Sequence, residues 1–125
     1  MPPSSYEEFQ ERYEADGDAE RRAYSAMPLA SLLERVRGRD YGANYQLWPA
    51  IASKATLDEA GWVLFDVLTS DADYLVRYHC ADALIKIAGR KLRGMTAVML
   101  SGGKGHGTPQ HLETVRAMLP ERDAE

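Results

Sequence analysis

One predicted helix carries a regularly spaced row of polar side chains that could do chemistry. The row repeats at i, i+3, i+7 and i+11 and consists of His79, Asp82, Lys86 and Arg90. Residues at this spacing share one side of a helix. His79 and Asp82 could pass a proton between them, but the sequence offers no nucleophile and no third orienting group near them. We therefore predict no catalytic residues, and the row is either a partner-binding surface or an ordinary solvated face.

The other nucleophilic and metal-ligating residue types do not gather into a site. Cys80 takes a small-residue position on the same helix, which favours a buried and inert thiol. Because it is the only cysteine, an internal disulfide and a cysteine-based zinc site are excluded. His106 and His111 lie five residues apart, which is not a recognised spacing for a pair of ligands. We expect no metal and no cofactor.

A glycine-rich segment, SGGKGHGTP, precedes the last predicted helix. Its glycines would let backbone N–H groups face an anion, and Lys104 adds a positive charge. A P-loop, however, needs a glycine-lysine-Ser/Thr order after a strand, and the sequence has neither. The segment is interpreted as a flexible connector, with contact to a phosphate or an acidic partner as the alternative.

Charge is distributed unevenly along a chain whose net charge is −4. Residues 1–26 contain seven acidic and three basic residues, whereas residues 86–116 contain six basic residues and one acidic residue. The basic segment 86–104 consists of Lys86, Arg90, Lys91, Arg93 and Lys104. It could contact nucleic acid or phosphate, or an acidic protein surface that includes the chain's own N-terminal helix, or it could simply aid solubility. No aromatic residue follows Tyr78, which argues against stacking on single-stranded nucleic acid.

The elements that would position these residues are predicted to be almost entirely helical. We expect helices over 5–15, 19–26, 29–37, 45–54, 57–69, 74–88, 90–100 and 109–119. Gly17, Gly38 and Gly89 are expected to end helices, and Gly94 is expected to break the helix at 90–100 near its start. Asn44 would cap the helix at 45–54, and Pro49 would bend it. The helix at 57–69 begins with a Thr56–Glu59 capping box and is apolar nearly all round, so other helices should cover it on several sides.

Self-comparison indicates a repeat of 31 residues. At this shift Leu33, Val36, Asp40, Ala50 and Ala52 align with Leu64, Val67, Asp71, Ala81 and Ala83. Trp48 aligns with His79, a position that we expect to be exposed. Trp48 would then be a binding hot spot beside Tyr41 and Tyr45, unless the N-terminal helices cover it.

The middle unit, LFDVLTSDADYLVRYHCADALIKIAG at 64–89, resembles a HEAT repeat or its bacterial HEAT-like relatives. The matching positions are Asp71, Val76, Arg77, Cys80, Ala81, Ala83, Leu84, Ile87 and Gly89. The match extends less closely over 27–54 and 90–119, where Gln46 replaces the family's arginine and a long glycine-rich insertion appears. The resemblance implies that Asp71 and Arg77 are structural and hold the stack of repeats together. It also implies binding, because such proteins mostly serve as scaffolds.

The expected fold class is therefore all-α, as a short HEAT-like α-solenoid of stacked antiparallel helical hairpins. Within one domain, residues 1–26 would form N-terminal capping helices, 27–54, 57–89 and 90–119 the hairpins, and 120–125 a frayed tail. We predict a non-catalytic protein-binding adaptor or regulator. The partner face would consist of His79, Asp82, Lys86, Arg90 and Trp48. Alternatives are nucleic-acid or phosphate binding through 86–104, and a small enzyme. The N-terminus lacks a secretory signal and no stretch suits a membrane span, so we expect a cytoplasmic protein.

Overall fold

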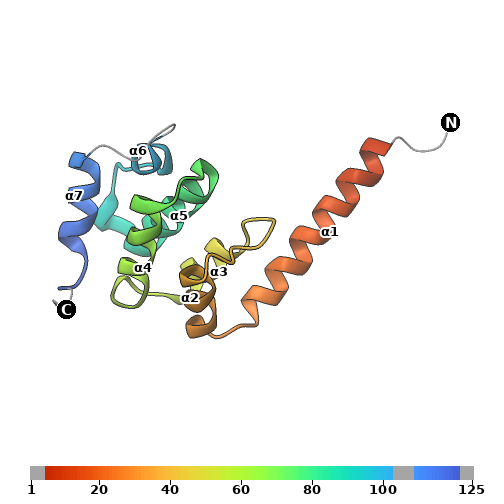
Figure 1. Cartoon of the computed structure of the whole chain (residues 1–125), viewed down its shortest axis with the longest axis horizontal. Helices are drawn as coiled ribbons and strands as arrows, with labels where there is room; N and C mark the ends of the chain where they lie inside the picture. Colours follow the sequence, from red (N-terminus) through yellow and green to blue (C-terminus); the bar gives the residue numbers. More distant parts are fainter. Residues whose placement is uncertain (1–4, 103–108, 122–125) are drawn as a thin grey trace.

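The computed structural model describes residues 5–102 and 109–121, and side chains from residue 14 onward. In these ranges the chain is all-helical and contains no strand. The elements are α1 (Ser5–Ser25), α2 (Leu29–Arg37), α3 (Leu47–Lys54), α4 (Leu57–Ser70), α5 (Tyr74–Ala88), the 3₁₀ helix η1 (Gly89–Leu92), α6 (Ala97–Ser101) and α7 (Pro109–Met118) (Figure 1). No described helix combines the length and the apolar character needed to cross a membrane.

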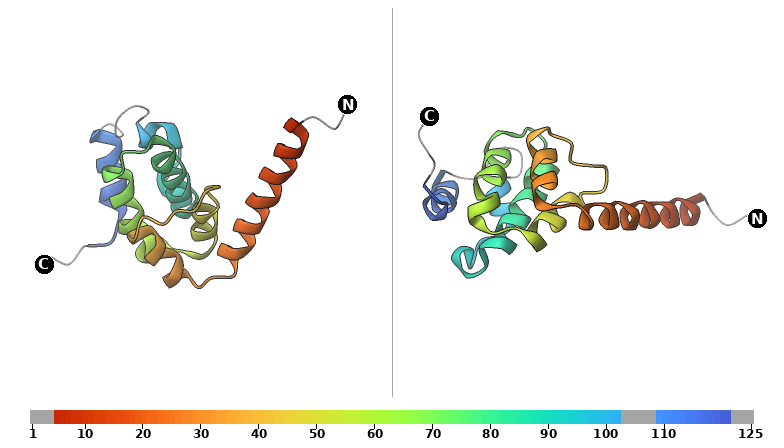
Figure 2. Two further views of the ribbon diagram at one scale, coloured as in Figure 1. Left: turned by 45° about the vertical axis from the view of Figure 1, so that its right-hand side comes forward. Right: turned by 90° about the horizontal axis from the view of Figure 1, so that it is seen from below.

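Helix α5 lies at the centre of the packing. It contacts α4, α6 and α3, while α2 packs on both α3 and α4. Helix α7 packs on α6 and is also tied to α4, because the Trp62 indole donates a hydrogen bond to the Pro120 carbonyl at 2.7 Å. Helix α1 contacts α3 near its C-terminal end and otherwise projects from the body (Figures 1 and 2).

The helix boundaries follow local capping chemistry where the sequence supplies it. The predicted capping box is confirmed: the Glu59 N–H donates to the Thr56 hydroxyl, and the Glu59 carboxylate accepts from the Thr56 N–H. Asp73 caps α5 by accepting from the Leu75 N–H at 2.9 Å. Gly89 ends α5 with φ of 57°, a conformation that glycine adopts without a Cβ clash. The predicted helices at 29–37, 57–69 and 74–88 are therefore present within a residue of the expected ends.

One expectation about a helix end is wrong. Gly17 does not stop a helix, because α1 runs through it as one element of 21 residues. A mid-helix glycine costs only about 1 kcal/mol relative to alanine, so a helix can continue through it. The break expected at Gly94 is present, because residues 90–100 divide into η1 and α6 with Gly94 at φ of 87° in the turn between them.

The start of α3 also differs from the prediction. The helix begins at Leu47 rather than Tyr45, and Asn44 is not its cap. Pro49 therefore lies in the first turn, where a missing N–H breaks no intrahelical hydrogen bond and no bend is required. The two residues lost from the helix join a loop over 38–46 that carries the unusual backbone described below.

Candidate functional site

The open side of α5 holds most of the predicted partner face. We define the α5 face as Leu75, Tyr78, His79, Asp82 and Lys86. Leu75 is 49% exposed, an uncommon exposure for a large apolar side chain in this structure, and Tyr78, His79 and Asp82 are half-buried. Lys86 forms an ion pair with Asp82 at 2.9 Å, so the C-terminal part of the α5 face consists of two opposite charges on one helix. Arg90, predicted to extend the row, lies beyond the end of α5 in η1 and is exposed.

A tyrosine that the helical spacing does not include lies over this face. The ring of Tyr45 stacks on His79 with centroids 4.3 Å apart and planes 15° apart, and Tyr78 meets His79 edge-on at 5.4 Å. Burial lowers the pKa of His79, and nearby Lys86 lowers it further, while Asp82 acts in the opposite direction. The imidazole is therefore neutral at pH 7 and presents one donor and one acceptor.

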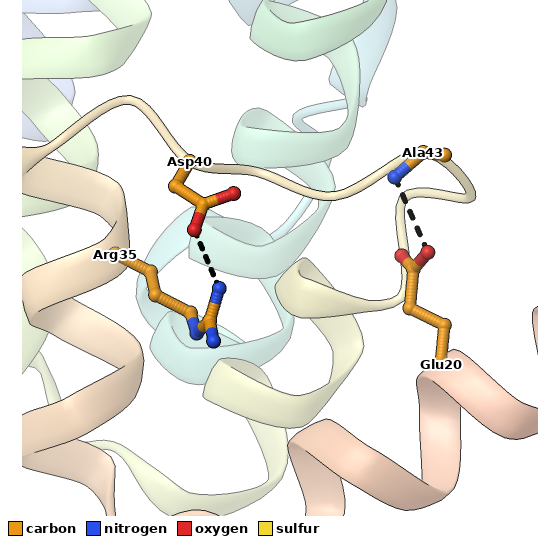
Figure 3. Close-up of polar contacts among 4 residues, drawn as sticks. All are labelled: Glu20, Arg35, Asp40 and Ala43. Atoms are coloured by element: carbon orange, nitrogen blue, oxygen red, sulfur yellow. Dashed lines mark hydrogen bonds and ion pairs between the residues drawn. The ribbon is translucent and has the colours of Figure 1, made fainter.

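The loop that carries Tyr45 is held by one carboxylate from α1. Glu20 accepts a hydrogen bond from the Ala43 N–H at 3.2 Å (Figure 3). It also accepts from the N–H groups of Asn44 at 3.1 Å and Gln46 at 3.2 Å, and from the Asn44 side-chain amide at 3.0 Å. Converging N–H groups of this kind form a nest for an anion. Asn44 thus binds Glu20 instead of capping α3.

Backbone conformation in the same loop is unusual. Tyr45 has φ of 60° and Arg39 has φ of 58°, in the left-handed region that side chains other than Gly, Asn and Asp rarely adopt. At Gly42, φ is 78°, and a Cβ would collide with the Tyr24 hydroxyl and with Glu20. An ion pair, Arg35 to Asp40 at 2.6 Å, secures the beginning of the loop (Figure 3). Such strain persists only where the surroundings impose it, and it often marks a functional surface.

Asp71 and Arg77 lie together in the interior at the turn between α4 and α5. Arg77 is 2% exposed and donates to the Asp71 carbonyl at 3.0 Å and to the Ser101 carbonyl at 3.1 Å, which joins the turn to the end of α6. The Asp71 carboxylate accepts from the Tyr41 hydroxyl and the Asp73 N–H, each at 2.9 Å. Burial and the hydrogen bond to Asp71 raise the pKa of Tyr41 to about 12.

Trp48 does not belong to the exposed face, and the prediction that it does is wrong. It is 1% exposed and packs against Tyr41, with ring centroids 5.2 Å apart. Trp48 is the second residue of α3, whereas His79 is the sixth residue of α5, so the 31-residue alignment does not place them at equivalent helical positions.

Of the remaining predicted residues, some are exposed, Cys80 is buried, and others lie outside the described part of the chain. Arg90, Lys91 and Arg93 are exposed in and after η1, whereas residues 103–108, which include Lys104, His106 and most of the glycine-rich segment, lie outside the described residues. Cys80 is fully buried, its Sγ lies 3.0 Å from the Leu64 carbonyl, and burial raises the pKa of its thiol, so it is protonated. Among the described residues no three His, Cys, Asp or Glu side chains are grouped to hold a metal.

Sequence reasoning missed a cavity of about 500 Å³ between α2 and α4. Val36, Val63 and Val67 supply apolar walls, and Arg39 and Trp62 also line it. The predicted stacking of the hairpins places these two helices side by side, but it does not indicate an open space between them. The spacing of apolar residues within each helix could only indicate that both have a buried side.

Comparison with known proteins adds no relative: no family model, no curated protein and no solved structure matches the chain.

Proposed function

We propose that this chain is a non-catalytic protein-binding adaptor or regulator, and that the α5 face together with Tyr45 takes the partner. The stacked Tyr45–His79 pair beside exposed Leu75 is the observation that carries this proposal. Tyrosine is enriched among the residues that dominate binding energy at interfaces. Because Glu20 and the loop already fix Tyr45, little additional side-chain ordering is required when a partner binds.

The chemistry of the face defines the partner segment. An aliphatic or aromatic side chain would pack against Leu75 and Tyr78 at the N-terminal end of α5. A hydrogen-bonding group would meet neutral His79, and a pair of opposite charges would meet Asp82 and Lys86 at 2.9 Å from each other. Such an alternation of apolar and charged contacts gives both affinity and register.

We further propose that the helices form a short HEAT-like array, with α5 on its inner side. Two parallel sets of contacts support this arrangement, because α2 packs on α4 while α3 packs on α5. That is the pattern expected when the hairpins α2–α3 and α4–α5 stack as neighbouring units. The Arg77 hydrogen bonds to Asp71 and Ser101 would connect the second unit to a third that begins at α6.

Site-specific photo-crosslinking in the native cell tests the binding proposal. A benzoylphenylalanine at position 75 should capture one protein, while the same group at exposed position 113 on α7 should not. Reversing the charge pair (Asp82→Lys with Lys86→Asp) should abolish the adduct while circular dichroism stays unchanged. Identical adducts at positions 75 and 113, or an adduct from position 75 that survives the reversal in a folded variant, would contradict the proposal.

A further inference from the structure

The sequence of α1 contains a row of acidic residues along one side of the helix. Glu7, Glu11, Glu14 and Asp18 recur at i, i+4, i+7 and i+11. In the part of α1 with described side chains, Glu14, Asp16 and Asp18 are exposed, and Asp18 pairs with Arg21 of the same helix. Seven acidic and three basic residues over 1–26 make this the most acidic part of the chain.

A surface of the opposite charge follows α5. Arg90, Lys91 and Arg93 occur within four residues and are exposed. None of the three lies within ion-pair distance of a carboxylate in the described part of the chain. We call them the basic segment and leave out Lys86, because Asp82 already neutralises it.

The acidic row and the basic segment of one chain lie on different sides of the molecule. In Figures 1 and 2, α1 projects from the side of the body opposite α7, whereas the cyan segment that contains η1 lies on the side near α7. The described helix that α1 contacts most is α3, not η1 or α6. The two charged surfaces can therefore meet without refolding only if they come from two molecules.

We propose that two copies of this chain associate reciprocally, with the acidic row of each α1 lying on the basic segment of the other copy. Two equivalent contacts close into a two-fold dimer, the commonest symmetry of soluble oligomers. At 21 residues, α1 spans roughly 31 Å, long enough to extend across a neighbouring molecule. Docking would also stabilise α1, because most helical stability in proteins comes from packing rather than from intrinsic propensity. This interface is independent of the proposed function, because it uses neither Leu75 nor the Tyr45–His79 stack.

Sedimentation of the full chain tests the association directly. Wild-type protein should show a monomer–dimer equilibrium at about 50 mM salt, and the dissociation constant should rise at least about tenfold at about 500 mM salt. Acid reversal (Glu7→Lys, Glu11→Lys and Glu14→Lys) and base reversal (Arg90→Glu, Lys91→Glu and Arg93→Glu) should each weaken dimerisation by at least about tenfold, because attraction becomes repulsion. Glu113→Lys and Arg116→Glu, exposed charge reversals on α7, should leave it unchanged.

Mixing the two reversed variants gives the decisive result. Each variant alone should be monomeric, and their equimolar mixture should form a heterodimer, because each α1 again meets a segment of opposite charge. The restored complex also shows that both variants are folded. A wild type that stays monomeric at low salt, or a mixture that stays monomeric while the wild type dimerises, would overturn the proposal. Retention of the wild type on DNA at low salt, lost on base reversal with dimerisation intact, would assign the segment to nucleic acid instead.

Discussion

Tyr41 connects the 38–46 loop to the buried turn at Asp71 through a single hydroxyl. We expect Tyr41→Phe to lower the free energy of unfolding by about 1–2 kcal/mol, because the Asp71 carboxylate loses a hydrogen bond in a largely buried setting. Urea unfolding at pH 7 measures this. Tyr78→Phe is the control, since the Tyr78 hydroxyl has no hydrogen-bond partner among the described residues. Equal losses in the two variants would show that the hydrogen bond is not the cause.

The Tyr41 hydroxyl also makes the stability of the fold depend on pH. The pKa of Tyr41 is about 12 in the folded chain and near 10 when unfolded, so folding favours the protonated phenol. Its contribution is fully present below pH 10 and is lost as the pH rises toward 12. Tyr41→Phe should remove this part of the alkaline loss of stability, which the difference between the two unfolding curves would reveal.

The lowered pKa of His79 predicts that the stability of the fold decreases at mildly acidic pH. Its pKa is lowered in the folded chain, chiefly by burial beneath Tyr45, so the unfolded chain binds a proton more readily. Stability should fall as the pH drops from about 7 through the unfolded value near 6.5 and on to the lower folded pKa. His79→Gln should be less sensitive over this range than wild type. An NMR titration of His79 with a midpoint at or above 6.5 would contradict the prediction.

At the scale of the elements, helices with local signals could be predicted and loops with distant partners could not. The Thr56–Glu59 capping box and the helix-ending Gly38 and Gly89 are local chemistry, so α2, α4 and α5 were predictable. The prediction that Gly17 ends a helix was wrong because a glycine weakens a helix without ending it. The start of α3 depends on Glu20, 27 residues before Leu47, and no spacing rule reports a contact of that range.

In the candidate site, too, helical spacing predicted one part, whereas the other part depends on contacts between distant residues. Helical spacing predicted that His79, Asp82 and Lys86 share a side of α5, because that follows from 3.6 residues per turn. It could not place Tyr45 over His79, since the stack depends on a left-handed residue held by the Glu20 nest. The sequence left open whether Trp48 is exposed or covered, because its burial against Tyr41 is a tertiary contact that helical spacing does not report.

Gly42 tests how much the loop depends on this nest. Gly42→Ala should destabilise the chain by about 2 kcal/mol or more, because a Cβ meets the Tyr24 hydroxyl and Glu20 in addition to the strain of positive φ. Gly94→Ala is the matched control, since Gly94 also has positive φ but no atom lies near its Cβ position, and about 1 kcal/mol is expected there. Thermal unfolding gives both values. A larger loss at Gly94 would show that the packing around Gly42 is not tight.

The whole molecule consists of a helical body and the projecting α1. Three contacts near the C-terminal end of α1 join them: Glu20 in the nest, Tyr24 in the core, and Lys54, which donates to the Ser25 and Met27 carbonyls. Residues 14–19 are exposed apart from Gly17, so they add little to the core of the body. We therefore expect the last turns of α1 to stabilise the body and the earlier turns to mediate self-association.

Deleting residues 1–16 should separate them. The shortened chain keeps Glu20 and Tyr24, and Asp18 is well suited to cap the new helix start. We expect its free energy of unfolding to stay within about 1 kcal/mol of wild type, because no described buried side chain is removed. Dimerisation should be lost, since most of the acidic row is gone. Urea unfolding and sedimentation on the same sample measure the two effects.

Glu20→Ala in the full chain should give the opposite pattern. It removes the only carboxylate that the Ala43, Asn44 and Gln46 N–H groups contact in the described structure, so stability should fall by about 1–3 kcal/mol. The acidic row is untouched, so the folded fraction should still dimerise under native conditions. A deletion that unfolds the body, or a Glu20→Ala variant as stable as wild type, would show that α1 supports the body along its length rather than through its last turns.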